Sequence, residues 1–404
     1  MTLESVLDRI EGAREEMVNS LIEICRIPAI HPDSGGDGES KKAEFLKGMI
    51  ENMGLPVRSV DAPDDRVSTG VRPNLLVEVD GEEKRRIWIV SHSDIVPEGD
   101  LKSWDSDPFD PVVKDGKIFG RGTEDNGQAL IASLYALWAV KEENEKMKLS
   151  CGLAIVADEE TGSDKGIQYL LEQGIFDPDD LILVPDFSSP EGEEIEIAEK
   201  NILWLRVKTI GRQAHGSLPN KAINAHRAGA ELMLRADKEL HSKYDHKNEM
   251  FDFPVSSFEP TKKETNVPNI NTIPGEDILY FDCRMLPDVP PADVKDLVRK
   301  LADEIEQEYN VKVEIGVMQE ETSPPTREDS EIVVKLANAI RSVKGLEPKM
   351  VGIGGGTCAA YFRQKGFDAP VWTSGDKMAH DSNEYAVIDN LVNDSKVFAS
   401  VLLS

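Results

Sequence analysis

The stretch Arg86-Ile-Trp-Ile-Val-Ser-His-Ser-Asp94 leads from an unbroken apolar segment directly into a histidine and an aspartate. Residues 87–90 are all apolar, which is typical of a strand buried on both faces, as in parallel sheets covered by helices. His92 and Asp94 then stand at the carboxyl end of that strand. Because ligands bind at this edge of open α/β sheets, the stretch predicts both a fold class and the position of a site.

Similar apolar runs, separated by helical stretches, continue to about residue 200. They lie at residues 74–79, 153–157 and 181–184. Residues 112–119 contain Asp115-Gly116, a pair that favours a hairpin turn. An apolar helix is expected over about 127–140, inside the molecule and against the sheet. This alternation predicts an α/β fold with a mostly parallel sheet.

The pattern changes at residue 202. Strand-like segments at 202–210, about 251–258, 278–285 and 311–317 are combined with helical segments at 221–240 and 292–309. Their order, β-α-β-β-α-β, is that of a split-βαβ (ferredoxin-like) domain. The first pattern resumes with a helix near 330–343 and a strand around 369–372. We therefore expect a larger domain, residues 1–201 and 319–404, with a small domain, residues 202–318, inserted into it.

Composition excludes several classes of partner. The 404 residues carry a formal charge of −29, which repels nucleic acid and anionic lipid. No apolar run approaches the ~18 residues that a membrane span needs, and the first residues lack a signal-peptide layout. Cys25, Cys151, Cys283 and Cys358 show no CxxC spacing, so neither disulfides nor a thiolate metal site is expected. We expect a cytoplasmic protein that binds neither nucleic acid nor membranes.

Acidic residues and a histidine follow three of the apolar runs. His92 and Asp94 follow the first run, Glu159-Glu160 the second and Asp186 the third. One sheet edge would collect them all. His92 and Asp94 suit a metal-bound imidazole oriented by a carboxylate, although a solvated loop is the alternative. Adjacent acids such as Glu159-Glu160 are also common in solvated turns, but their place after a buried strand favours a site.

Asp125 opens the apolar helix, where its structural role is an N-cap completed by Gln128, and this role is compatible with a binding role. Carboxylates grouped with histidines and without cysteine fit zinc, cobalt or manganese in a catalytic site better than a closed structural zinc site. The sequence thus indicates a catalytic metal.

Several motifs together resemble the M20 metallopeptidase family. They are His92-Ser-Asp94, Trp104 with Pro108-Phe109 and Pro111, Gly120-Arg-Gly-x-x-Asp125, Asp158-Glu-Glu160, Gly211-x-x-Ala-His215 and Ala379-His380-x-x-Asn383-Glu384. The family includes succinyl-diaminopimelate desuccinylase, acetylornithine deacetylase, aminoacylase and glutamate carboxypeptidase. The motifs occur in the family order from residue 92 to 384, so the resemblance covers nearly the whole chain.

The resemblance implies two bridged divalent metal ions in the larger, catalytic domain. His92 and Asp186 would hold one ion, and Glu160 and His380 the other. Asp125 would bridge the two. We expect zinc, with cobalt and manganese as alternatives.

Further catalytic roles follow from the same resemblance. Asp94 would orient His92, and Glu159 would be the general base that takes a proton from the attacking water and passes it to the leaving nitrogen. His215, by position alone, is equally a surface histidine. In similar enzymes it reaches the active site of a partner subunit and stabilises the tetrahedral intermediate, which implies a homodimer formed through the small domain, the lid.

Substrate-binding residues are implied as well. Asn271 and Arg284 match lid residues that bind carbonyl and carboxylate groups, and a guanidinium can hold a carboxylate with two parallel bonds. Gly355, Gly356 and Thr357 match a Gly-Gly-Thr segment that lines the substrate site. A nucleotide loop is the alternative, but Thr357 stands where a GxGxxG pattern needs its last glycine, and no GK[ST] follows.

Two departures concern the substrate. Asn126-Gly-Gln128 stands where many members have Met-Lys-Gly or Asp-Lys-Gly, and Asp186 stands where the desuccinylases have glutamate. The resemblance therefore implies a small-molecule amidohydrolase acting on an N-acyl amino acid, such as acylated diaminopimelate or ornithine. A dipeptidase or carboxypeptidase on the same site is the alternative. The intact Glu159 and full ligand set argue against an inactive binding protein.

Overall fold

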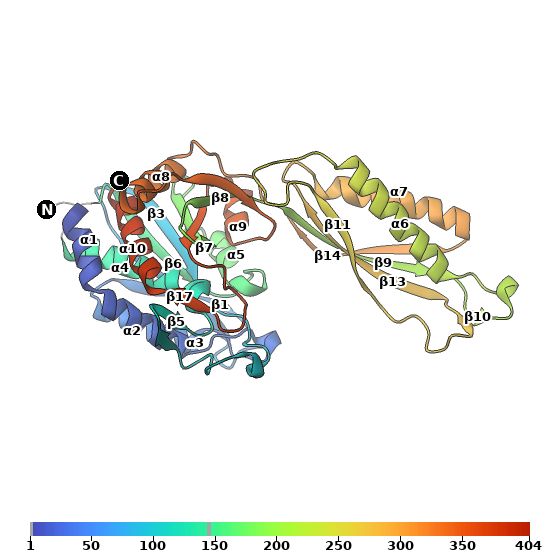
Figure 1. The fold of residues 1–404 in the computed structure, drawn as a ribbon, viewed down its shortest axis with the longest axis horizontal. Helices are drawn as coiled ribbons and strands as arrows, with labels where there is room; N and C mark the ends of the chain where they lie inside the picture. Colours follow the sequence, from blue (N-terminus) through green and yellow to red (C-terminus); the bar gives the residue numbers. More distant parts are fainter. Residues whose placement is uncertain (1–2, 144–146) are drawn as a thin grey trace. The chain divides into compact units, whose positions relative to one another are not determined.

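The apolar stretch quoted above forms β3 (Glu83–His92), a central strand of the largest sheet in the computed structural model (Figure 1). The structure describes residues 3–143 and 147–404. Residues 87–92 are buried. Trp88 and Val90 pack with α5 (Ile167–Glu172) and α9 (Ala359–Gln364), while α4 (Ala129–Glu142) contacts the same strand.

Contacts divide the described chain into two compact units. Unit 1 comprises Met1–Ile197, Thr326–Val351 and Thr357–Ser404; unit 2 comprises Ala198–Pro325 and Gly352–Gly356. The bounds expected from the sequence were 202 and 318, with the glycine-rich segment in the larger domain. In the structure that segment packs with unit 2, because Gly352 bridges to Phe251 and the Gly354 carbonyl accepts a hydrogen bond from Arg284.

The large sheet of unit 1 is parallel in its centre. Its strand order is β1 (Val57–Pro63), β2 (Val71–Val79), β6 (Leu149–Val156), β3, β7 (Leu181–Ser189), β16 (Val371–Ser374), β8 (Glu194–Glu199) and β15 (Lys349–Ile353). β6, β3, β7 and β16 run parallel, whereas β1, β2 and β6 pair antiparallel. The predicted mostly parallel sheet is confirmed.

Helices surround this sheet. They are α1 (Leu3–Gly12), α2 (Arg14–Cys25), α3 (Ser40–Asn52), α4, α5, α8 (Glu331–Lys344), α9 and α10 (Ile388–Leu403), with the short turns η1 (Pro32–Ser34), η2 (Leu101–Ser103), η3 (Thr123–Gln128) and η4 (Glu159–Thr161). α4 is buried along almost its whole length against the sheet and α10, as its apolar sequence predicts.

The predicted hairpin forms a separate small sheet with a late strand. Its order is β17 (Tyr385–Val387), β5 (Lys117–Phe119) and β4 (Val112–Lys114). Asp115 and Gly116 have φ of 51° and 75°, the left-handed backbone that a tight hairpin turn requires.

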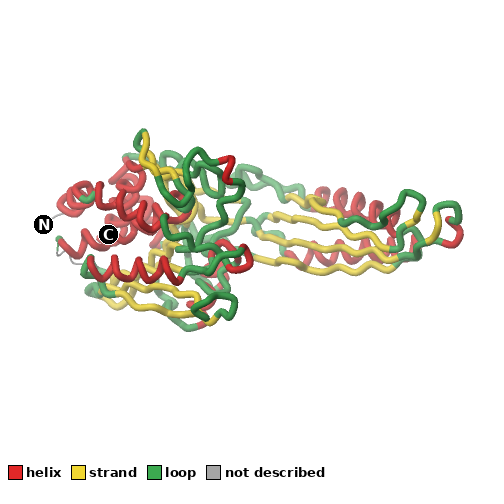
Figure 2. Tube along the Cα trace, turned by 90° about the horizontal axis from the view of Figure 1, so that it is seen from below, coloured by secondary structure: helices red, strands yellow, loops and turns green. Residues whose placement is uncertain are grey.

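Unit 2 is an antiparallel sheet with both of its long helices on one face (Figure 2). The strand order is β11 (Ser257–Lys263), β13 (Glu276–Met285), β9 (Asn201–Ile210) and β14 (Lys312–Glu321), and the helices are α6 (Ala225–Lys243) and α7 (Pro291–Tyr309). The predicted β-α-β-β-α-β order is confirmed. Two short additions, β10 (Ala214–His215) and β12 (Thr272–Ile273), pair with each other, and the turn η5 (Pro219–Lys221) follows β10.

One predicted strand was misplaced. The strand expected at 251–258 begins only at Ser257, because the Pro254 carbonyl accepts a hydrogen bond from the Asn248 N–H and closes a loop there. A proline also removes a ladder donor. Within the described ranges, no helix has the length and apolar character that a membrane crossing needs. All four cysteines are buried and free.

Candidate metal centre

The acidic and histidine residues predicted from the sequence meet at one edge of the large sheet. His92 ends β3, Glu159 and Glu160 form the turn after β6, and Asp186 lies in β7. β6 and β7 are the two neighbours of β3 and run parallel to it. The carboxyl ends of these strands therefore bring the residues together, as parallel topology requires.

Asp125 lies between two histidines. Its Oδ1 is 2.9 Å from His92 Nε2, and its Oδ2 is 3.2 Å from His380 Nε2. Asp186 Oδ1 is 3.6 Å from the same His92 nitrogen, and Glu160 Oε2 is 3.0 Å from that of His380. There are thus two groups of possible ligand atoms, each with one imidazole nitrogen and one carboxylate of its own, and both groups share the carboxylate of Asp125. Two bridged cations need this arrangement.

The donor atoms are close enough to hold cations. Ligand atoms of His92, Asp125 and Glu160 lie within 4.8 Å of one another, and so do those of His92, Glu159 and Asp186. Glu160 Oε1 is buried and has no hydrogen-bond partner among the described residues. Imidazole and carboxylate donors suit zinc, cobalt or manganese. The residues present therefore fit two divalent metal ions.

Electrostatics point in the same direction. Burial raises the pKa of Glu160 to about 7 and, with the charge of Asp186, raises the pKa of Glu159 well above its ordinary value. Hydrogen bonds to Asp125 and Glu160 raise the pKa of His380 to about 10. Several buried carboxylates thus repel one another here, and cations would relieve that repulsion.

Asp94 supports both halves of the centre. Its backbone oxygen lies 3.0 Å from His92 Nδ1, and its Oδ1 lies 3.4 Å from the same nitrogen. Its carboxylate also accepts hydrogen bonds from the N–H groups of Glu159 and Glu160, each at 3.1 Å. Asp94 therefore contacts the His92 ring and also holds the turn that carries the two glutamates, as the predicted orienting role requires.

The capping interpretation of Asp125 is wrong. Asp125 lies inside the irregular turn η3 with non-helical φ and ψ of −111° and 99°, and η3 has no side-chain cap. Gln128 donates to the Ser374 carbonyl and to Asp394 instead of closing a capping box. Contacts with His92 and His380 outweigh the local capping preference.

Two residues without a role predicted from the sequence support this turn. Glu384 is fully buried and accepts hydrogen bonds from the N–H groups of Gly122, Glu124 and Asp125 at 2.9–3.1 Å. Arg121 Nη1 donates to the same carboxylate at 2.7 Å. The motifs contain both Arg121 and Glu384, but their separation of 263 positions gives no local sign of pairing.

Asn126, one of the departures, holds a metal-centre residue. Its Nδ2 donates to Asp186 Oδ1 at 2.9 Å and to the Pro185 carbonyl at 2.7 Å. The amide thus fixes the carboxylate of Asp186, so the change from the family pattern has a structural use.

The predicted lid residues belong to unit 2, whereas the metal-centre residues all belong to unit 1. His215 is exposed and hydrogen bonds to Ser217, and the neighbouring Gly216 N–H donates to the Asn271 carbonyl. Arg284 is held by Asp282. His215 and Asn271 therefore lie together, at the end of the sheet opposite to Arg284.

That separation follows from strand register. Arg284 pairs with Ile202 at one end of β9, and Glu276 pairs with Ile210 at the other, just before the β10–β12 pair. Eight residues of strand span roughly 26 Å. One chain therefore cannot offer His215 and Arg284 to the same small molecule.

The glycine-rich segment is divided between the units. Gly355 and Gly356 are exposed in unit 2, and Thr357 is buried in unit 1. Thr357 Oγ1 accepts a hydrogen bond from the Ala359 N–H at the start of α9.

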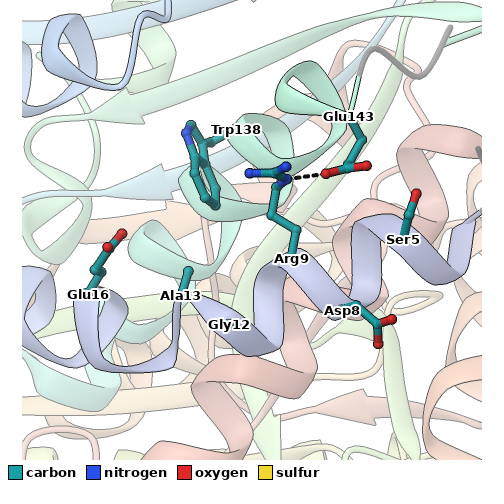
Figure 3. Close-up of a pocket in the computed structure, with 8 residues that line it drawn as sticks. All are labelled: Ser5, Asp8, Arg9, Gly12, Ala13, Glu16, Trp138 and Glu143. Carbon is teal, nitrogen blue, oxygen red and sulfur yellow. Dashed lines mark hydrogen bonds and ion pairs between the residues drawn. The ribbon is translucent and has the colours of Figure 1, made fainter.

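Two cavities of unit 1 differ in chemistry. One of about 60 Å³ adjoins the metal centre and is lined by Glu124, Asp125, Asn126, Pro185, Asp186, Phe187, Ser188, Thr373 and Ala379. Another, of about 580 Å³, lies among α1, α2 and α4, where Arg9 pairs with Glu143 beside Trp138 (Figure 3). Its lining contains none of the predicted site residues, so of these two cavities the smaller one adjoins the predicted site.

Comparisons with known proteins agree with this geometry. Residues 88–404 match peptidase family M20/M25/M40. An uncharacterised metallohydrolase of Methanococcus maripaludis is 39% identical over 99% of this chain and 100% of its own length. A succinyl-diaminopimelate desuccinylase of Thioalkalivibrio sulfidiphilus is 26% identical over 80% of this chain and 84% of its own.

The fold is also that of a solved structure. Human carnosine dipeptidase 1 superposes with a TM-score of 0.75 at 21% identity, over 99% of this chain and 98% of the other. The family match includes both His92 and His380. The chain therefore belongs to peptidase family M20/M25/M40 and is a metal-dependent hydrolase.

Proposed function

We propose that this protein is a dinuclear zinc amidohydrolase that removes the acyl group from an N-acyl amino acid, such as an acylated diaminopimelate or ornithine. The observation that carries the proposal is the position of Asp125, whose two oxygens face His92 and His380. Asp186 and Glu160 complete the two ligand sets. Zinc suits such mixed imidazole and carboxylate donors in an open catalytic site.

Two divalent cations held by these residues would polarise the scissile carbonyl and lower the pKa of water. Glu159 is then the general base. Its backbone is fixed by Asp94, and burial with the nearby charge of Asp186 raises its pKa. A buried carboxylate beside the two cations can accept a proton from water and pass it to the leaving nitrogen.

His215 supplies oxyanion stabilisation from a partner subunit. It lies beyond the Glu276 end of β13, and that strand spans roughly 26 Å from Glu276 to Arg284, so a substrate bound by Arg284 would meet the histidine of a second copy. Asn271 lies beside His215 and would act from the same copy as that histidine. This arrangement requires a homodimer formed through unit 2.

Arg284 binds the substrate carboxylate. Asp282 and the Gly354 carbonyl fix its guanidinium, and Gly355, Gly356 and Thr357 follow directly along the chain. A fixed guanidinium favours a substrate with a free carboxylate next to the cleaved amide. N-acyl amino acids have that chemistry.

A dipeptidase or carboxypeptidase remains the second candidate, because a dipeptide presents the same carboxylate and an amide at a similar distance. The similarity in fold to human carnosine dipeptidase 1 is compatible with this second candidate. The two differ in the group on the other side of the amide, an acyl chain or an aminoacyl residue with a cationic amine.

The test is a hydrolysis screen with zinc-loaded protein against N-succinyl, N-acetyl and dipeptide substrates of the same amino acids. We expect the highest kcat/KM for an N-acyl substrate. A preference for free dipeptides would support the peptidase candidate, and turnover by metal-free protein would overturn the metal-dependent mechanism.

A further inference from the structure

His380 lies on an exposed loop that joins β16 to β17. Its φ is +67°, and Lys377 and Asn383 on the same loop have φ of +61° and +60°. Residues other than glycine disfavour this backbone, so an unsupported loop would not hold the shape. The His380 side chain is 56% exposed, so burial does not fix it. Hydrogen bonds must therefore position this ligand.

Glu124 makes several of these bonds. Its Oε1 accepts from the Met378 N–H at 2.9 Å, and its Oε2 accepts from the Asp376 N–H at 3.1 Å. A Cβ added at Gly375 would lie only 2.9 Å from Glu124 Cδ, so the carboxylate packs closely against the beginning of the loop. Ser188 Oγ also donates to Oε1 of this carboxylate, at 3.2 Å.

The opposite end of the loop, at Glu384, also bonds to the Asp125 turn. Glu384 accepts hydrogen bonds from the N–H groups of Glu124 and Asp125 at 2.9 and 3.1 Å. Arg121 Nη2 donates to the His380 carbonyl at 3.3 Å. Two carboxylates thus link the Asp125 turn and the His380 loop in both directions, and Glu124 holds the end that Glu384 does not reach.

We propose that Glu124 is a positioning residue for the second metal site, formed by Asp125, Glu160 and His380. Its carboxylate keeps the His380 loop in its strained shape against the Asp125 turn. This inference rests on the dinuclear site of the proposed function. Since Glu124 touches neither His92 nor Glu159, its loss should weaken the second cation and spare the first.

The experiment compares wild type with Glu124→Gln, Glu124→Ala and Ser188→Ala, after metal removal. Ser188→Ala is the matched control, because it deletes one hydrogen bond of Glu124 but keeps both bonds to the loop. Zn²⁺ binding is followed by calorimetry, Co²⁺ binding by visible absorption, and folding by thermal denaturation of the metal-free proteins.

Wild type and Ser188→Ala should bind two equivalents. Glu124→Ala should keep the first affinity within about twofold and lose roughly 10- to 100-fold at the second. The amide of Glu124→Gln offers one acceptor oxygen, so its affinity for the second equivalent should lie between those of wild type and Glu124→Ala. This variant replaces Glu124→Ala in the test if Glu124→Ala does not fold.

The role of Glu124 would be overturned if Glu124→Gln bound both equivalents with equally reduced affinity, or if its affinities were unchanged. Either result would leave two-metal binding by wild type in place. Wild type that binds a single equivalent would overturn the dinuclear site and this inference with it. Neither result depends on the substrate screen, so the two proposals fail separately.

Discussion

Arg284 donates two hydrogen bonds to the carboxylate of Asp282 on the same strand, β13. Its Nε lies 2.7 Å from Asp282 Oδ1, and its Nη2 lies 3.2 Å from Asp282 Oδ2. The two residues are two positions apart, so both side chains are on the same face of the sheet. The pair fixes the plane of the guanidinium before substrate arrives, which reduces the ordering cost of binding a carboxylate. This fixed orientation suits the anchoring role proposed for Arg284.

Replacing Arg284 with alanine should raise KM for a substrate with a free carboxylate by roughly 10²-fold, since a charge-assisted pair is lost. Arg284→Lys should recover only part of this, because an ammonium cannot form the fork. The control substrate is the carboxamide analogue, whose kcat/KM should be low in wild type and little changed by the substitutions. Equal loss on both substrates would contradict the anchoring role.

Glu159 and Glu160 are neighbours with different expected roles, so their variants should fail differently. Glu159→Gln should lower kcat by at least about 10²- to 10⁴-fold and keep both metals, because only the proton acceptor is removed. Glu160→Ala should lose metal as well as activity. Elemental analysis measured beside the rate separates the two, and an active Glu159→Gln would place the base elsewhere.

Metal binding should release protons. Hydrogen bonds to Asp125 and Glu160 raise the pKa of His380 to about 10, so the metal-free imidazole is protonated at neutral pH. A cation binds only the neutral ring, and the proton must leave. Affinity for the second cation should therefore rise about tenfold per pH unit up to about pH 10, and then level off.

Below about pH 7 the dependence should be steeper, because burial raises the pKa of Glu160 to about 7 and a second proton then competes. Calorimetry in buffers of different ionisation enthalpy measures the release. Affinity that stays constant from pH 7 to 9, with no proton released, would contradict this account.

The sequence predicts the sheet edge well, because the signals there are local. β3, β6 and β7 each contain a buried apolar run, and the predicted site residues stand at or just beyond the end of that run. β8 is different: it is buried although its sequence, Glu-Ile-Glu-Ile-Ala-Glu, resembles an exposed strand. Glu196 is accommodated there by Arg363, 167 positions away, and no local pattern reveals that partner.

The same limit applies within the site. Capping rules place Asp125 at a helix start, but its direction is set by His92 and His380, which come from distant segments. The role of Glu124 is likewise invisible from its own turn, because it depends on backbone N–H groups about 250 positions later. Residue types predict the ligands, whereas their supports emerge only from the fold.

The last prediction concerns His215, which is expected to act across the dimer. His215→Ala and Glu159→Gln should each be nearly inactive as homodimers that retain their metals. The His215 side chain is exposed and hydrogen bonds to Ser217 close by in the chain, so its loss should not disturb the metal centre. The two variants can therefore be combined.

When both variants are unfolded and refolded together, a mixed dimer has one site with intact Glu159 and a good His215 from the other chain. Its second site carries both defects. Random mixing makes about half of the dimers mixed, and each has one working site of two, so about a quarter of wild-type activity should return. If no activity returns although mixed dimers are shown to form, His215 acts within its own chain or has no catalytic role.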